Sequence, residues 1–270
     1  MAPTRPLLEH ALTAGVTALD TAFNYDAYAG HRVLARAAAG GLLEKFEVST
    51  KVGYFPDGHT LEPARLRAAV ERAAAELGRP PDTVLLHNPE HAPAGLAAAC
   101  DTLAACRDAG LCAAWGIAAW NPSPLLSAAA GIDVRPDVLM VRAGLAVRGD
   151  VLDAAERLTL ALGAADRWGM APFAGNPNDP VWSKVDATVF LEPGQRASAS
   201  RVQAGLAAAF ALPAVSRIAV GTSSPQHLDE LAAAVRYAAG PAVVDEYREL
   251  LRAGAGRRKG DQRAAHAHHG

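Results

Sequence analysis

The sequence predicts an α/β fold in which parallel strands alternate with helices and close into a barrel. The chain has 270 residues, 50% of them hydrophobic, which is enough to fill the core of one large domain. Seven short apolar segments alternate with longer stretches rich in Ala, Leu and Arg. The doubly wound alternative is disfavoured, because no G-x-G-x-x-G follows the first segment and no G-x-x-x-x-G-K-[ST] occurs anywhere.

The seven apolar segments are predicted as buried strands. In chain order they are VTALD (16–20), FEVSTKV (46–52), TVLLHN (83–88), AAWGIAA (113–119), VLMVRA (138–143), WGMAPF (168–173) and RIAVG (217–221). Each is a run of apolar and β-branched residues rather than an alternation of apolar and polar ones. Such runs are typical of parallel strands that are covered on both faces.

The stretches between the strands are predicted as helices. In LEPARLRAAVERAAAELG (61–78), for example, apolar residues recur every three or four positions among strong helix formers. Strands that alternate with helices form a parallel sheet with crossover connections. We expect a single barrel domain over residues 1–253 and a flexible polar tail over 254–270, where the apolar period is lost.

Charge and targeting features indicate a cytoplasmic protein with a small-molecule partner. The formal net charge is −2 and no stretch is strongly basic, which argues against nucleic acid and membrane surfaces as partners. No signal peptide or membrane-spanning run is evident. Cys100, Cys106 and Cys112 are expected to be free thiols. No metal site is predicted, and the tail histidines (His266, His268 and His269) are expected to be solvated.

Three chemically useful side chains fall at the ends of successive predicted strands: Asp20, Lys51 and His87. In a parallel barrel, functional residues lie at the carboxyl ends of the strands. Reduction of a carbonyl needs a proton donor near the developing oxyanion, and a tyrosine can serve if an ammonium stabilises its phenolate. A carboxylate keeps that ammonium charged, and a histidine can orient the substrate. Tyr25 follows Asp20 closely and completes the set.

Taken one at a time, these residues have ordinary structural interpretations. Asp20 alone could cap a helix, Lys51 could be a solvated charge, and His87 could be a hydrogen-bonded core histidine. Tyr25 could be a surface aromatic residue. Their combination at strand ends, in this order, favours a catalytic group.

The three motifs resemble those of the aldo-keto reductase superfamily. Its D-T-A-x-x-Y is similar to Asp20–Tyr25, its third-strand lysine matches Lys51 in STKVG, and its fourth-strand histidine matches His87 in LLHNP. The resemblance implies a (β/α)8 TIM-type barrel, with Tyr25 as proton donor and NADP(H) as cofactor. The family's N-terminal first strand is missing, so either Met1 is not the natural start or another segment fills the gap.

The resemblance also implies a cofactor-binding loop near the C-terminus. The segment RIAVGTSSPQHLDELAAAV looks like the family's last strand, loop and helix, where the adenosine phosphate of NADP is held. A helix N-terminus with small residues suits an anion. The predicted contacts are Gly221, Thr222, Ser223, Ser224, Gln226 and His227. The loop has no basic residue, so the preference for NADPH over NADH rests on the resemblance.

The nicotinamide end departs from the family pattern. Ala118 and Ala119 stand where the family has a Ser-Asn pair, and Met140 stands where it has a glutamine. Met170 and Ala171 replace the stacking aromatic residue and its serine. The same segment contributes Phe173, Ala174 and Gly175 to the predicted cofactor site. Each lost hydrogen bond should weaken nicotinamide binding by about 1 kcal/mol.

The sequence thus predicts an oxidoreductase that reduces an aldehyde or ketone, or oxidises the alcohol, with NADPH. Two alternatives remain open. One is a cofactor-free acid/base enzyme that catalyses elimination or isomerisation next to a carbonyl, and the other is a catalytically inactive binding barrel. Phe55, Trp120 and Trp182 could line the substrate pocket or simply pack in loops.

Overall fold

A computed structural model describes residues 3–176 and 179–267. Seven strands form one parallel sheet in the order β1-β2-β5-β6-β7-β8-β9. Their bounds are β1 (Ala18–Asp20), β2 (Glu47–Val52), β5 (Thr83–His87), β6 (Ala114–Ala119), β7 (Val138–Arg142), β8 (Asp166–Met170) and β9 (Arg217–Ala219). Each lies within, or within two residues of, the segment predicted for it, so the predicted strand set is confirmed.

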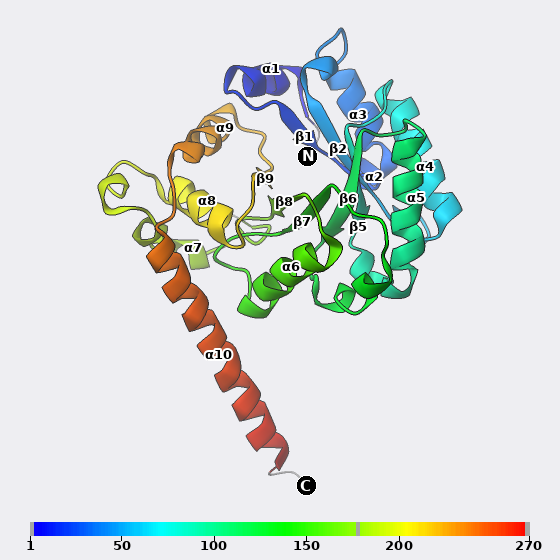
Figure 1. Ribbon diagram of the computed structural model, residues 1–270. Coiled ribbons are helices and arrows are strands. Elements are labelled where there is room, and N and C mark those ends of the chain that lie inside the picture. The colour runs from blue at the N-terminus through cyan, green and yellow to red at the C-terminus, as the bar shows by residue number, and fades with distance from the viewer. Residues whose placement is uncertain (1–2, 177–178, 268–270) are drawn as a thin grey trace.

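Helices connect successive strands and cover the outside of the sheet (Figure 1). They are α1 (Arg5–Thr13), α2 (Tyr25–Tyr28), α3 (Gly30–Ala37), α4 (Pro63–Leu77), α5 (Leu96–Asp108), α6 (Gly149–Leu162), α7 (Val181–Lys184), α8 (Arg201–Ala211), α9 (Pro225–Ala232) and α10 (Pro241–Ala267). Local sequence explains their ends. At α4, the Glu62 side chain accepts hydrogen bonds from the backbone of Ala64 and Arg65, and Gly78 ends the helix with a φ of 77°.

Strand alternation separates two apolar layers. On β7, Leu139 and Val141 pack with the helices in the main core, whereas Val138 and Met140 join a smaller cluster with Leu85. Neighbouring residues on a strand point to opposite faces of the sheet. The smaller cluster therefore fills the barrel interior, and the main core lies between the sheet and its helices.

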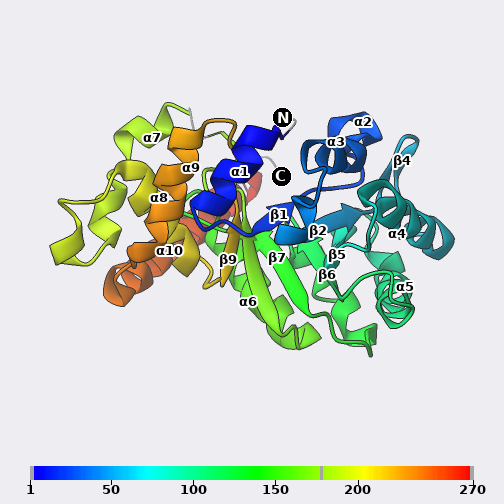
Figure 2. The ribbon, with the colours of Figure 1, turned by 90° about the horizontal axis from the view of Figure 1, so that it is seen from above.

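The barrel is nearly closed, with an opening between β1 and β9. These strands are the two ends of the sheet order, and no described strand lies between them. Arg217 on β9 forms an ion pair with Glu47 on β2 across the opening. Outside it, α1 lies beside α9, and His10 contacts Asp229 at 2.7 Å (Figure 2). The fold is thus the expected (β/α) barrel without the family's first strand.

Two other elements lie outside the predicted pattern. An antiparallel hairpin, β3 (Tyr54–Phe55) with β4 (Gly58–His59), follows β2 and was not predicted. Helix α10 continues to Ala267 and projects away from the barrel (Figure 1). Residues 254–267 of the predicted tail are therefore helical, and their flexibility remains a prediction.

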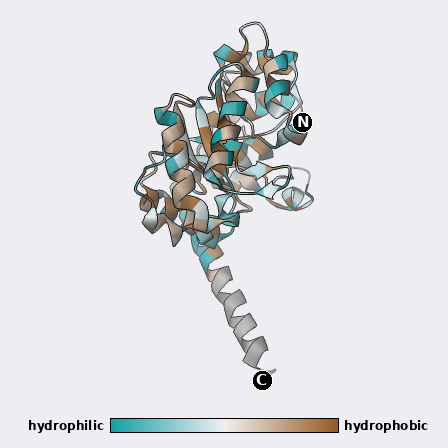
Figure 3. Cartoon of the chain, turned by 90° about the vertical axis from the view of Figure 1, so that its right-hand side faces the viewer, coloured by the Kyte–Doolittle hydropathy of each residue, from teal (hydrophilic) through white to brown (hydrophobic). Residues whose placement is uncertain are grey.

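The barrel's outer helices carry both hydrophilic and hydrophobic residues, as Figure 3 shows. One side of such a helix packs on the sheet while the other meets solvent. No helix within residues 3–176 or 179–267 combines the length and apolar character needed to cross a membrane.

Candidate active site

The parallel register brings Asp20, Lys51 and His87 to one mouth of the barrel. Each lies at or next to the carboxyl end of its strand, on β1, β2 and β5 respectively. Val52, next to Lys51, and Leu86, next to His87, pack in the main core outside the sheet. Because neighbouring residues of a strand point to opposite faces, Lys51 and His87 point to the inner side of the barrel. The predicted strand-end arrangement is therefore present.

Lys51 is held by oxygen atoms at the mouth. Its side chain is only 3% exposed, and its ammonium Nζ donates to Asp20 Oδ2 at 2.5 Å and to the carbonyl oxygen of Thr21 at 3.0 Å. The other carboxylate oxygen, Asp20 Oδ1, accepts from the Ser49 hydroxyl at 2.8 Å. A buried ammonium requires such partners, because burial without them disfavours its charge.

Tyr25 lies beside this ion pair on the short helix α2. Its ring centroid is 5.3 Å from Lys51 Nζ and 6.4 Å from the His87 ring, which meets it edge-on. Tyr25 is 43% exposed, so a substrate can reach its phenol. The backbone turns sharply after it, with positive φ at Asp26, Ala27 and Tyr28. The phenol makes no hydrogen bond to Lys51 or His87 among the described residues, so its role as proton donor remains a prediction.

His87 is held in a mostly apolar and aromatic setting. Burial, followed by the nearby charges of Lys51, His59 and His91, lowers the pKa of His87 to about 3. Its ring meets Tyr54 edge-on at 4.9 Å, and its Nδ1 has no hydrogen-bond partner in the described part of the chain. A neutral imidazole in this position can donate one hydrogen bond to a substrate oxygen.

A cavity of about 680 Å³ joins three of the four predicted catalytic residues to the barrel interior, and His87 does not line it. Asp20, Lys51 and Tyr25 line one side, and apolar side chains such as Met140 and Met170 line the other. Because β1 and β9 do not pair, the same cavity continues through the opening toward α1. The volume suits a small molecule. Charged residues line it both at the mouth and at the opposite ends of the strands, where Glu47, Asp82 and Arg217 lie.

The positions predicted to contact nicotinamide have different orientations. Ala118 and Met140 belong to the barrel-interior cluster, whereas Ala119 packs in the outer core. Phe173 packs with α8 and meets Trp182 edge-on at 5.7 Å. Ala174 and Gly175 form a left-handed turn, with φ of 56° and 80°. Their contacts with a cofactor remain predictions, and Ala119 has no side-chain access to the barrel interior.

The predicted phosphate loop lies between β9 and α9. Gly221 and Thr222 line the cavity, and Ser224 caps α9 by accepting a hydrogen bond from the backbone of His227 at 3.3 Å. A side chain at Gly221 would meet nothing within 4 Å. The loop members Ser223, Gln226 and His227 are exposed. This open helix start can accommodate an anion.

The three candidate pocket aromatics differ in position. Trp120 is 41% exposed and lines the cavity. Phe55 is buried in the main core instead. Trp182 donates from its indole to the carbonyl oxygen of Asn176 at 3.1 Å and does not line the cavity.

Several residues around the site were not identified from the sequence. Ser49 could have been found, because it shares the strand parity of Lys51. Tyr54, His59 and His91 surround His87, and His59 Nε2 contacts the His87 carbonyl oxygen at 2.9 Å. Tyr54 and His59 come from the unpredicted hairpin, whose two-residue strands leave no pattern in the sequence.

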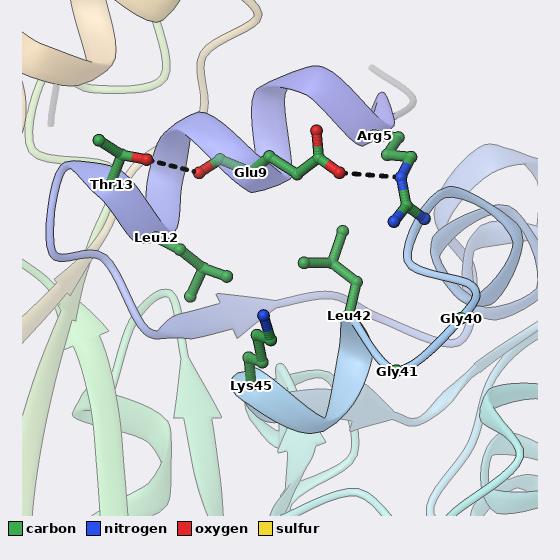
Figure 4. Close-up of a pocket in the computed structure, with 8 residues that line it drawn as sticks. All are labelled: Arg5, Glu9, Leu12, Thr13, Gly40, Gly41, Leu42 and Lys45. Carbon is green, nitrogen blue, oxygen red and sulfur yellow. Dashed lines mark hydrogen bonds and ion pairs between the residues drawn. The ribbon is translucent and has the colours of Figure 1, made fainter.

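A second pocket, of about 310 Å³, lies between α1 and the turn after α3 (Figure 4). Figure 4 shows the ion pair of Arg5 with Glu9 at its rim. None of its residues belongs to the catalytic group. The described residues also contain no group of three or more His, Cys, Asp or Glu side chains placed to hold a metal ion. His268 and His269 lie outside the described residues.

The comparison with protein families decides the assignment. The model of the Aldo/keto reductase family matches residues 2–145, which is more than half of the chain and contains Asp20, Tyr25, Lys51 and His87. The chain belongs to the aldo/keto reductase family. The fold and the resemblance predicted from the motifs are thereby confirmed.

Solved structures of aldo-keto reductases share the fold. One from Bacillus halodurans has a TM-score of 0.71 at 18% identity, over 92% of this chain and 86% of that one. One from Klebsiella pneumoniae, solved in complex with NADPH, has a TM-score of 0.67 at 19% identity, over 92% and 84%. An aldose reductase from Giardia lamblia has a TM-score of 0.68 at 16% identity, over 93% and 89%. At these identities the likeness concerns the barrel alone.

Proposed function

We propose that this aldo/keto reductase family member reduces an aldehyde or ketone with NADPH, or oxidises the corresponding alcohol, with Tyr25 as proton donor. The proposal rests chiefly on one observation. A buried lysine, paired with an aspartate at 2.5 Å, lies beside the ring of an accessible tyrosine at the mouth of a barrel. This arrangement suits proton transfer to a developing oxyanion.

Each member of the group has a distinct task. Tyr25 donates its phenolic proton to the substrate oxygen as negative charge develops there. Lys51 stabilises the resulting phenolate, and Asp20 holds the Lys51 side chain in place through their ion pair. His87, neutral because burial lowers its pKa, donates a hydrogen bond that orients the carbonyl. When bound, NADPH supplies the hydride for the other end of the carbonyl.

The residues around the cavity fit the two ends of such a cofactor unequally. At the phosphate end, the open loop around Gly221 and the start of α9 suit an anion. At the nicotinamide end, Ala118 and Met140 offer packing surface but no hydrogen bond from their side chains. We therefore expect the phosphate end to contribute most of the affinity.

The inward-facing Ala118 and Met140 favour one alternative enough to retain it. In this second candidate, the same Tyr25, Lys51 and His87 perform acid/base chemistry next to a carbonyl without any cofactor. A binding barrel without turnover has no comparable observation in its favour, because the buried Lys51–Asp20 pair is costly to keep for packing alone.

One experiment tests the proposed function and its alternative together. We expect purified Tyr25→Phe protein to lose about 100-fold or more of its carbonyl reductase activity, since the proton donor is gone. Its NADPH affinity, followed by nucleotide fluorescence, should match the wild type. Tyr28→Phe removes a neighbouring phenol and should leave both quantities unchanged. Retained turnover in Tyr25→Phe would contradict the role of Tyr25, and wild-type protein that binds no NADPH would favour the cofactor-free candidate.

A further inference from the structure

Arg142 ends β7 and faces the mouth of the barrel. Val138 and Met140, four and two residues earlier on the same strand, point into the barrel interior, so strand alternation directs Arg142 the same way at the top layer. Its partner in the sheet register is Met170, which lines the cavity. Arg142 therefore lies at the carboxyl-end rim of the sheet, beside the cavity-lining Met170 rather than in the cavity lining itself.

The Arg142 guanidinium has no oxygen partner among the described residues, although it is half-buried. Burial, followed by the positive charge of Arg148, lowers the pKa of Arg142. Asp150, whose charge raises the pKa of Arg142, is already paired with Arg148 through two contacts of 3.0 and 2.5 Å. By contrast Arg167, which is also half-buried, donates to Thr159 and to a backbone carbonyl oxygen.

Trp120 holds the guanidinium from one face only. The centre of the Arg142 guanidinium lies 4.9 Å from the Trp120 ring centroid, within the range of a cation–π contact. Trp120 lines the cavity and is anchored, because Glu90 Oε1 accepts hydrogen bonds from the backbone N–H groups of Trp120 and Asn121 at 2.7 and 2.9 Å. A stacked guanidinium keeps its N–H edge free for a planar anion.

We propose that Arg142, supported by Trp120, binds the carboxylate of an anionic carbonyl substrate and makes the enzyme selective for such substrates. This inference rests on the proposed carbonyl reduction at Tyr25. The cofactor's phosphates are the other source of a negative charge. The phosphates are disfavoured, because the predicted phosphate loop follows β9 whereas Arg142 ends β7. Strand β8 lies between the two.

The test compares two substrates that differ in one charge, para-formylbenzoate and its methyl ester. Wild-type enzyme should prefer the acid. In Arg142→Met, kcat/KM for the acid should fall about 10- to 100-fold, the usual contribution of a charge-assisted hydrogen bond. The value for the ester should change by less than about twofold, and NADPH affinity should stay constant. Arg142→Lys should recover part of the preference. Arg148→Met, which removes the exposed arginine nearby, should behave like the wild type.

If the wild type is active, two outcomes overturn the inference. An equal loss for acid and ester would make Arg142 a structural residue. A weaker NADPH affinity in Arg142→Met would assign the guanidinium to the cofactor. If the wild type reduces neither aldehyde, the proposed function fails. Calorimetry of the binding of the two aldehydes to the wild type and to Arg142→Met then tests the role of Arg142 separately. Binding of para-formylbenzoate that is lost in Arg142→Met would still support it, whereas equal binding of acid and ester would end it.

Discussion

His87 combines a position in the proposed active site with an unusual environment for a titratable group. Its pKa is lowered from 6.5 to about 3 by burial and by Lys51, so the imidazole is neutral wherever the native state persists near neutral pH. Hydrogen bonding to a carbonyl oxygen suits this form, whereas proton donation does not. The division of labour proposed above, with Tyr25 as the acid and His87 as an orienting group, follows from this difference.

The same shift predicts acid-sensitive stability. In the unfolded chain His87 binds a proton as the pH falls through its ordinary pKa of 6.5, whereas in the native protein it does so only near its lowered pKa of about 3. The free energy of unfolding therefore decreases as the pH falls from 6.5 toward 3. Between about pH 7 and pH 5, the free energy of unfolding of the wild type should fall by about 1–2 kcal/mol more than that of His87→Gln. Urea denaturation at a series of pH values measures this difference. The pKa values of His31 and His59 are also lowered, which leaves some pH dependence.

The exposed His227 provides the matched control for this measurement. His227→Gln should keep the wild-type dependence of stability on pH. If His87→Gln also kept it, the native imidazole would not be neutral in this window, and its assignment as an uncharged hydrogen-bond donor would be wrong.

At the scale of elements, the seven strands were predictable because each is a buried run of apolar residues, and the sequence alone locates them within a few positions. The hairpin of β3 and β4 was not, because two-residue strands carry no periodicity. The catalytic group followed from strand ends in chain order. Arg142 did not, since its unpaired state depends on where Asp150 and Trp120 lie in space.

Gly116 shows how closely two central strands approach. A Cβ added there would lie 2.1 Å from the Val138 carbonyl oxygen on β7 and 2.8 Å from the Leu85 side chain on β5. Both contacts are too close, and neither the Val138 backbone nor the packed Leu85 side chain can move far enough to relieve them unless a strand shifts. Glycine at this position is therefore a packing requirement of the sheet.

We expect Gly116→Ala to lower the free energy of unfolding by about 3 kcal/mol or to prevent folding, because the alanine would push β6 away from its neighbours. Gly131→Ala is the control, since a Cβ there meets nothing within 4 Å. Its stability should be unchanged or up to about 1 kcal/mol higher. Urea denaturation of both proteins measures the difference, and similar midpoints would show that β6 and β7 are not held as closely as described.

Over the whole molecule, the opening between β1 and β9 is the main departure from a closed barrel. Within the described residues, the Arg217–Glu47 ion pair and the contact between His10 and Asp229 are polar interactions that link its two sides. Both involve exposed groups, which usually contribute little to stability. The continuous backbone ladder that joins the other strands is absent there, so this side of the barrel should be the first to open.

Hydrogen exchange can measure that difference strand by strand. Amides of β1 (Ala18–Asp20) and β9 (Arg217–Ala219) should exchange about tenfold or more faster than those of β5 (Thr83–His87), because each edge strand opens by breaking a single ladder. β8 (Asp166–Met170) serves as the internal control, since it adjoins β9 but has neighbours on both sides. It should exchange as slowly as β5. Protection of β1 and β9 equal to that of β8 would mean that the opening is closed in solution, either by direct pairing of the two strands or by a strand that inserts between them.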